Sequence, residues 1–174
     1  MTKQDNNGSN NEPCFHAVWQ KYQGRGVLAL SQDNLEEAVV QFSIAAFVLS
    51  VDSLPAATLL RAESLVALAR VNLRLYRSDK ALPLLHEAMD LRRGLLPECH
   101  TLNVEALHLL ANAEREQKRY AEADTHYGLA YTFLSELGYE NTELAIELLG
   151  DWLASGAEWR TRTTPGGANS RKSA

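Results

Sequence analysis

Hydrophobic residues recur three and four positions apart through most of the chain, whereas the strict alternation of apolar and polar residues typical of a β-strand is rare. This spacing predicts an all-α protein. Short polar segments, some with Gly or Pro, interrupt the pattern at residues 32–34, 52–55, 78–79, 95–100, 118–119 and 138–141. Together these interruptions divide the body of the chain into about seven helices.

The clearest pattern spans residues 107–130, where two apolar helix faces lie on either side of the interruption at 118–119. Small alanines on both faces allow the two helices to approach closely, while the larger side chains fill the space beside the crossing. This segment therefore predicts a helical hairpin. Its contact residues are Leu107, Leu110, Ala111, Tyr120, Ala123, Tyr127 and Ala130.

The same layout occurs twice more, upstream of this hairpin. The matching residues are Leu65, Leu68, Ala69, Ala81, Leu85 and Ala88 in the nearer copy and Tyr22, Gly26, Ala38, Phe42 and Ala45 in the first copy. The alanines that open the second helices, Ala38, Ala81 and Ala123, lie 43 and 42 residues apart. The chain is therefore predicted to consist of repeated hairpins.

These residues resemble the tetratricopeptide repeat, in which a large apolar residue, an apolar and small pair, an aromatic, and a small-aromatic-small ladder follow in this order. The spacing exceeds the usual period of about 34 residues and is similar to the extended repeats of kinesin-light-chain-like proteins. The resemblance implies a helix-hairpin solenoid of about three repeats over residues 13–160. The departures from the pattern are Arg25 in the first repeat and Asn72 and Ser78 in the second.

Residues 142–159 resemble the first helix of one more hairpin, without a partner helix after it. A stack of hairpins ends in an exposed apolar face, so we expect this helix to act as a C-terminal cap. Trp152 and Trp159 are expected to seal that end of the stack.

The ends of the chain and its net charge limit the kinds of function and location that we expect. Residues 1–12 and 161–174 are polar and are expected to be disordered tails, the second of them basic. The net charge of -5 argues against nucleic-acid and membrane binding, which need a basic face. The N-terminal residues lack the apolar core of a secretory signal and no apolar stretch is long enough to span a bilayer, so we expect a cytoplasmic protein.

Two Cys/His pairs have the chemistry of zinc ligands: Cys14 with His16, and Cys99 with His100. Neither pair has a Cys-x-x-Cys core, and the repeat geometry gives no reason for the pairs to meet. We therefore expect no zinc site.

Other signals of chemistry are weaker still. Glu105 and His108 have the spacing of di-iron ligands, but residues 63–66 of the preceding repeat read ESLV and supply no second copy. No phosphate-binding loop of the Gly-x-x-x-x-Gly-Lys or Gly-x-Gly-x-x-Gly type occurs. We expect neither an enzyme nor a bound cofactor.

The resemblance implies that the first helices of the hairpins line a concave surface that binds a partner. By analogy with tetratricopeptide grooves, the partner-binding residues are those on the first helices that point away from the hairpin contact. They are Glu63, Val66, Arg70, Leu73 and Arg74 in the second repeat and Glu105, His108, Leu109, Asn112, Arg115 and Glu116 in the third.

These residues suggest roles that remain open. The arginines could pair with the carboxylates of an acidic peptide, or they could be solvated and paired with neighbouring glutamates. Asn112, expected to be exposed in the middle of a helix, could hold the backbone of an extended peptide. The apolar floor of the groove would consist of Val66, Leu73 and Leu109.

The function that this reasoning favours is a non-enzymatic adaptor or scaffold, which binds a peptide or helix of another protein in its concave groove. With about three repeats the stack is near the minimum for stability, so dimerisation is a further expectation. Two alternatives remain: a structural subunit of a homo-oligomeric or hetero-oligomeric assembly, and a secretion-type chaperone, whose shorter repeats count against it.

Overall fold

The computed structural model describes residues 15–51 and 53–163. The helices are α1 (Phe15–Ser31), α2 (Leu35–Val48), α3 (Pro55–Arg74), α4 (Ser78–Arg92), α5 (Thr101–Glu116), α6 (Tyr120–Glu136) and α7 (Glu143–Thr163), and a short 3-10 helix, η1 (Leu49–Val51), continues α2. These residues contain seven α-helices and no β-strand, so the predicted all-α class and the number of helices are confirmed for them.

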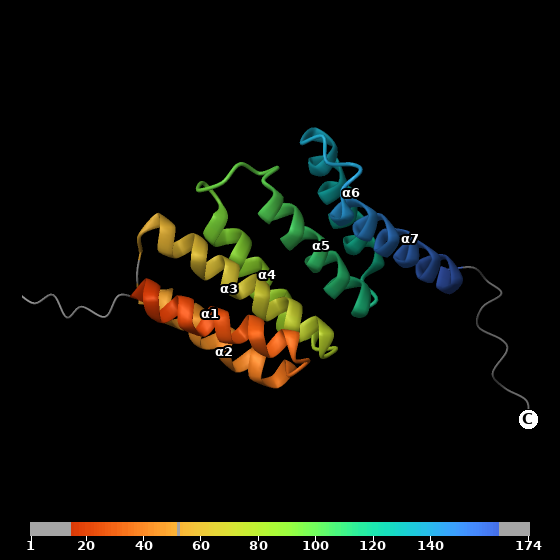
Figure 1. Cartoon of the computed structure of the whole chain (residues 1–174). Helices are drawn as coiled ribbons and strands as arrows, with labels where there is room; N and C mark the ends of the chain where they lie inside the picture. Colours follow the sequence, from red (N-terminus) through yellow and green to blue (C-terminus); the bar gives the residue numbers. More distant parts are fainter. Residues whose placement is uncertain (1–14, 52, 164–174) are drawn as a thin grey trace, which may run out of the picture.

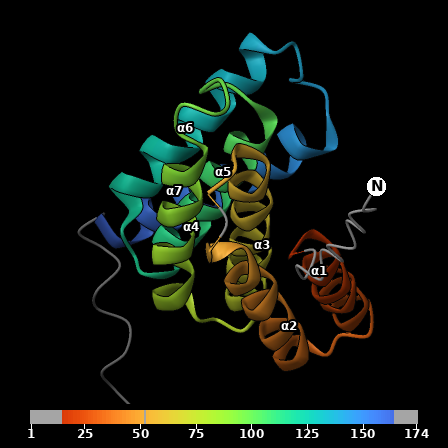
Figure 2. The ribbon, with the colours of Figure 1, turned by 90° about the vertical axis from the view of Figure 1, so that its left-hand side faces the viewer.

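The helices pack in consecutive pairs, α1 with α2, α3 with α4, and α5 with α6, and α7 packs mainly on α6. Each pair also contacts the next one, through α2 with α3 and α4 with α5. Helices α1, α3 and α5 lie side by side on one side of the molecule, and α2, α4 and α6 lie behind them (Figures 1 and 2). The first helices of the pairs therefore form a common face, which α7 extends.

The turn inside each pair has the same backbone geometry. Asp33, Tyr76 and Lys118 adopt positive φ angles of 57°, 55° and 65°, and they lie 43 and 42 residues apart, the predicted repeat spacing. In each turn the next amide donates a hydrogen bond back to the preceding helix, which ends that helix. The bonds are Asn34 N to Ala29 O (2.9 Å), Arg77 N to Asn72 O (2.8 Å) and Arg119 N to Glu114 O (2.9 Å).

The second of these turns differs from the prediction. The interruption was expected at residues 78–79, but α4 already begins at Ser78 and the turn lies at residues 75–77. The reason is that Tyr76, a residue type uncommon in the left-handed region, occupies the positive-φ position.

The predicted contact ladder is buried. Twelve of its small and large side chains are at most 1% exposed: Ala38, Phe42, Ala45, Ala69, Ala81, Leu85, Ala88, Leu110, Ala111, Ala123, Tyr127 and Ala130. In the first pair the two helices cross closely, because a Cβ added to Gly26 would lie 2.6 Å from Cε1 of Phe42. The intervals of 42 and 43 residues therefore correspond to equivalent buried positions in the three pairs.

The polar departures from the repeat pattern have partners. The side chain of Asn72 is buried in α3 and donates to the carbonyl of Leu68 at 2.9 Å. At the corresponding position of α5, buried Glu114 accepts a hydrogen bond from Nδ1 of His126 at 2.7 Å. Arg25 avoids the core, since its guanidinium lies over the ring of Tyr22. Each of these polar side chains therefore has a partner within the fold.

Helix α7 covers part of the end of α6. Ala145 and Leu148 are fully buried there, and the indole Nε1 of Trp152 donates to Asp124 at 2.7 Å. Of the two tryptophans expected to seal this end, Trp152 packs against residues of α6, and Trp159 is 38% exposed.

The boundaries of the predicted tails are only partly testable. Helix α7 continues to Thr163, three residues into the segment 161–174 expected as a tail. Residues 1–12 and 164–174 lie outside the described residues. Within the described ranges, no helix combines the length and the apolar character needed to cross a membrane.

Candidate binding groove

Two adjoining hollows lie on the face formed by the first helices. One lies between α1, α3 and α5, where Val27, Leu30, Glu63 and Val66 are among the lining residues. The other lies between α3, α5 and α7, and its lining includes Leu109, Leu144 and Glu147. Arg70, Leu102 and Glu105 line both hollows, which we therefore treat together as the groove.

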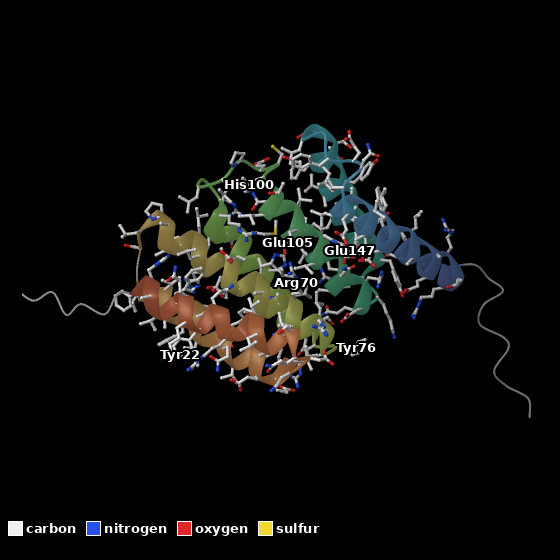
Figure 3. The ribbon with its side chains drawn as sticks, viewed as in Figure 1. Tyr22, Arg70, Tyr76, His100, Glu105 and Glu147 are labelled. Carbon is white, nitrogen blue, oxygen red and sulfur yellow. The ribbon has the colours of Figure 1, made fainter. Side chains whose placement is uncertain are left out.

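Six of the predicted partner-binding residues line the groove: Glu63, Val66, Arg70, Glu105, His108 and Leu109. Five do not: Leu73, Arg74, Asn112, Arg115 and Glu116. Figure 3 shows Arg70, Glu105 and Glu147 close together near the middle of this face. The helical register thus places half of the predicted set around one hollowed surface.

The predicted arginines are held by carboxylates of the chain itself. Arg70 on α3 forms an ion pair with Glu105 on α5. Arg74 binds Asp33 in the first turn at 2.7 Å. The Arg115 guanidinium lies 3.4 Å from a carboxylate oxygen of α7. Of the two roles left open for them, internal pairing is therefore the one observed, although all three partners lie on other elements and none on the arginine's own helix face.

The carboxylate that meets Arg115 belongs to Asp151, which joins α7 to α5. Its Oδ2 accepts hydrogen bonds from Nε2 of His108 at 2.8 Å and from Nδ2 of Asn112 at 3.0 Å. Asn112 in turn accepts a hydrogen bond from the hydroxyl of Tyr127. Asn112 is therefore not the exposed mid-helix residue that the sequence suggested, because α7 covers it and supplies its partner.

The contacts in this cluster shift the pKa values of Asp151 and Tyr127. The hydrogen bond from His108 lowers the pKa of Asp151, with further lowering from Asn112 and Arg115, while burial acts in the opposite direction. Burial raises the pKa of the Tyr127 hydroxyl. The carboxylate of Asp151 is thus stabilised in its charged form and holds α7 against α5.

Two other expectations are corrected by burial. His108, interpreted as part of an exposed helix face, is 3% exposed because α7 lies over it. Leu73 packs in the core between the second and third pairs and does not contribute to the groove floor. Val66 is also buried, but its side chain still lines the hollow.

Arg92 is a lining residue that the sequence reasoning missed. It is 1% exposed, and its Nη1 donates to the carbonyl of Leu102 at 2.5 Å, which fixes the start of α5. Burial lowers the pKa of its guanidinium, and the negative charge of Glu63 raises it. The available signal was its position, since residue 92 continues the buried stripe of Ala81 and Leu85 along α4.

The charges along the groove are mainly acidic at its surface. Glu63 and Glu147 are exposed, whereas Glu105 is paired with Arg70 and the guanidinium of Arg92 is buried. Beside these charges lie Val27, which is 56% exposed, and Leu102, which is 36% exposed. The groove therefore offers apolar surface flanked by carboxylates.

The possible metal ligands do not gather in the described part of the chain. No group of three or more His, Cys, Asp or Glu side chains there could hold a metal ion. Cys99 is a free, partly buried thiol, and Cys14 lies outside the described residues. Glu105 and His108, the pair with di-iron spacing, are instead bonded to Arg70 and Asp151.

No known protein-family model matches this sequence, and no curated protein is significantly similar to it. The resemblance to tetratricopeptide repeats consequently stays a prediction from the residue pattern. The groove itself is defined by its geometry and lining residues alone.

Proposed function

We propose that the consecutive pairs form a short tetratricopeptide-like solenoid that acts as a non-enzymatic adaptor and binds an extended segment or helix of another protein in the groove. The observation that carries this proposal is that two adjoining hollows on the face of the first helices share Arg70, Leu102 and Glu105 as lining residues. A preformed groove favours binding because the protein does not lose conformational entropy in forming it.

The charge of the groove suggests what it binds. The sequence alone left acidic peptides as candidates for the arginines, but Arg70, Arg74 and Arg115 each have a carboxylate partner within the chain. Arg70 is exposed as well but forms an ion pair with Glu105, so the exposed carboxylates of the groove are those of Glu63 and Glu147. We therefore propose a ligand segment with apolar side chains next to lysine, arginine or a free amino terminus, since opposite charges steer and orient association.

A pair of matched valines allows this proposal to be tested. Val27 lines the groove and is 56% exposed, whereas Val40 on α2 is 49% exposed and lines neither hollow. The immobilised protein is used to select binders from a library of random peptides, and the selected peptides are then measured by calorimetry against the wild type, Val27→Glu and Val40→Glu.

The proposal expects peptides that are enriched in basic and apolar residues, with binding lost in Val27→Glu and retained in Val40→Glu. Both substitutions add the same charge at similarly exposed sites, so circular dichroism should report the same helical content for both. Equal binding by the two variants would show that the groove is not the binding site. Selection of acidic peptides would instead restore the arginines as the recognition residues.

A further inference from the structure

Helix α7 has an exposed apolar face at the position where the earlier pairs have a second helix. A shift of 42 residues, one of the two repeat spacings, places Ile146, Leu149 and Leu153 of α7 on the contact positions that face the second helix in the preceding pair. The equivalent residues of α5 are Val104, Leu107 and Ala111, which are 0%, 2% and 0% exposed because α6 covers them.

The same face of α7 is uncovered. Ile146 is 66% exposed and Leu153 is 71% exposed, and between them Gly150 has no side chain and no atom close to its Cβ direction. A terminal helix that served only as a cap would be expected to show a polar outer face. The contact positions of α7 are therefore those of a helix that still lacks a partner.

We propose that the partner is α7 of a second copy of this chain, packed antiparallel across this face. The spacing is self-complementary, because a two-fold axis close to Gly150 places Ile146 of each copy against Leu153 of the other. The glycine at the axis allows the two backbones to approach closely. Residues 164–174 contain no Val, Leu, Ile, Met or aromatic residue, so that segment has no side chain like those of Ile146 and Leu153 with which to fill the face.

The overall charge distribution along α7 favours the antiparallel orientation. Its first half carries Glu143, Glu147 and Asp151, whereas its last turns carry Arg160 and Arg162 against the single acidic residue Glu158. An antiparallel pair brings the acidic half of each helix toward the basic end of the other, whereas a parallel pair would place like charges side by side.

The size of the surface determines how strong the dimer is. A helix of 21 residues is about 30 Å long, and one face of it buries less than the roughly 800 Å² per partner of a standard stable complex. The dimer is therefore reversible, and its population rises with protein concentration. This inference rests on the exposed apolar face of α7, and Glu147 is the only residue named for it that also lines the groove.

The first test compares the molar mass of the full chain by analytical ultracentrifugation over roughly a hundredfold range of concentration. The wild type should change from monomer to dimer, and Leu153→Glu should weaken the dimer at least about tenfold. Phe47→Glu is the control, because Phe47 is 74% exposed on α2, which lies at the opposite end of the molecule from α7 (Figure 1). It should leave the dimer unchanged.

A second test examines the orientation. Ile146→Glu and Leu153→Lys should each be monomeric alone, but an equal mixture should form a heterodimer, since the new charges face each other only in the antiparallel register. A wild type that stays monomeric throughout would overturn the proposal. So would species that grow beyond a dimer, a dimer that Phe47→Glu disrupts and Leu153→Glu does not, or a mixture that fails to associate.

Discussion

The crossing of α1 and α2 yields a sharp prediction, because α1 has two glycines in different surroundings. Gly24 has no atom within 4 Å of an added Cβ, whereas a Cβ on Gly26 would lie 2.6 Å from Cε1 and 2.8 Å from Cδ1 and Cζ of Phe42. Replacement of Gly by Ala in the interior of a helix is worth about 0.8–1.0 kcal/mol of helix propensity. Gly24→Ala should therefore raise the free energy of unfolding by about 0.5–1 kcal/mol.

Gly26→Ala gains the same propensity but adds a clash. Carbon atoms in favourable contact are about 3.5–4.0 Å apart, so the new methyl group would overlap the ring by about 1 Å. The Phe42 ring is 1% exposed and packed with Leu68 and Val71, which limits its movement, although one side of it borders the groove. Overpacking of this kind costs about 1–3 kcal/mol. Because the propensity gain is common to both variants, the difference between them measures the clash.

The measurement is chemical denaturation of the wild type, Gly24→Ala and Gly26→Ala, with the thermal midpoint as a second reading. Gly26→Ala should be about 1–3 kcal/mol less stable than Gly24→Ala, at about 2–4 °C per kcal/mol for a chain of this size. Combining Gly26→Ala with Phe42→Leu should recover part of the loss, although Phe42→Leu alone destabilises. Equal stabilisation by both alanines would refute the close crossing and, with it, the alignment of the first pair.

Three further substitutions test other parts of the structure. Asp151→Asn should lower the free energy of unfolding by about 1–3 kcal/mol at pH 7, because it weakens the charged hydrogen bond from His108. Folding lowers the pKa of Asp151 from a reference of 3.8, so its contribution to the free energy of unfolding is complete above pH 3.8 and is lost as the pH falls through the lower pKa of the folded state. The stabilities of the wild type and the variant should therefore converge in acid. A difference in stability that stays constant with pH would contradict the assignment. Leu85→Ala should cost about 2–5 kcal/mol in urea denaturation because Leu85 is fully buried between two pairs, and a loss below about 1 kcal/mol would argue against that packing. Trp19→Phe should cost about 1 kcal/mol through loss of the 2.8 Å hydrogen bond from its Nε1 to Ser64, and no change in the thermal midpoint would show that this bond contributes nothing.

Most of the fold could be predicted because its signals are local. The three-and-four spacing and the repeated alanines identified the helices and the hairpin contacts, which depend on residues close in sequence. The turn before α4 was misplaced because Tyr76 is not a typical residue for a positive φ angle. The position of this turn could still have been inferred from the first turn, where Asp33 and Asn34 are typical turn residues, by adding the repeat spacing of 43 residues to Asp33.

The candidate site was less predictable because its partners come from distant segments. Arg70 pairs with a residue 35 positions away, and Asp151 meets three side chains that lie 36 to 43 positions before it. Such contacts depend on how neighbouring pairs are rotated against each other, which helical periodicity does not specify. Arg92 was missed for a similar reason, since its carbonyl partner on Leu102 lies beyond a long linker.

The three turns at Asp33, Tyr76 and Lys118 have a consequence for how such a chain can change in length. Their backbones match although their side chains are acidic, aromatic and basic, so the geometry does not depend on one residue type. An insertion or deletion of one whole pair keeps each turn and each buried face in place. Insertion or deletion of one residue inside a helix rotates the rest of that helix by about 100°, so its buried face no longer meets the helix against which it packs. Growth or shortening of this architecture is therefore tolerated in whole units and not in single residues.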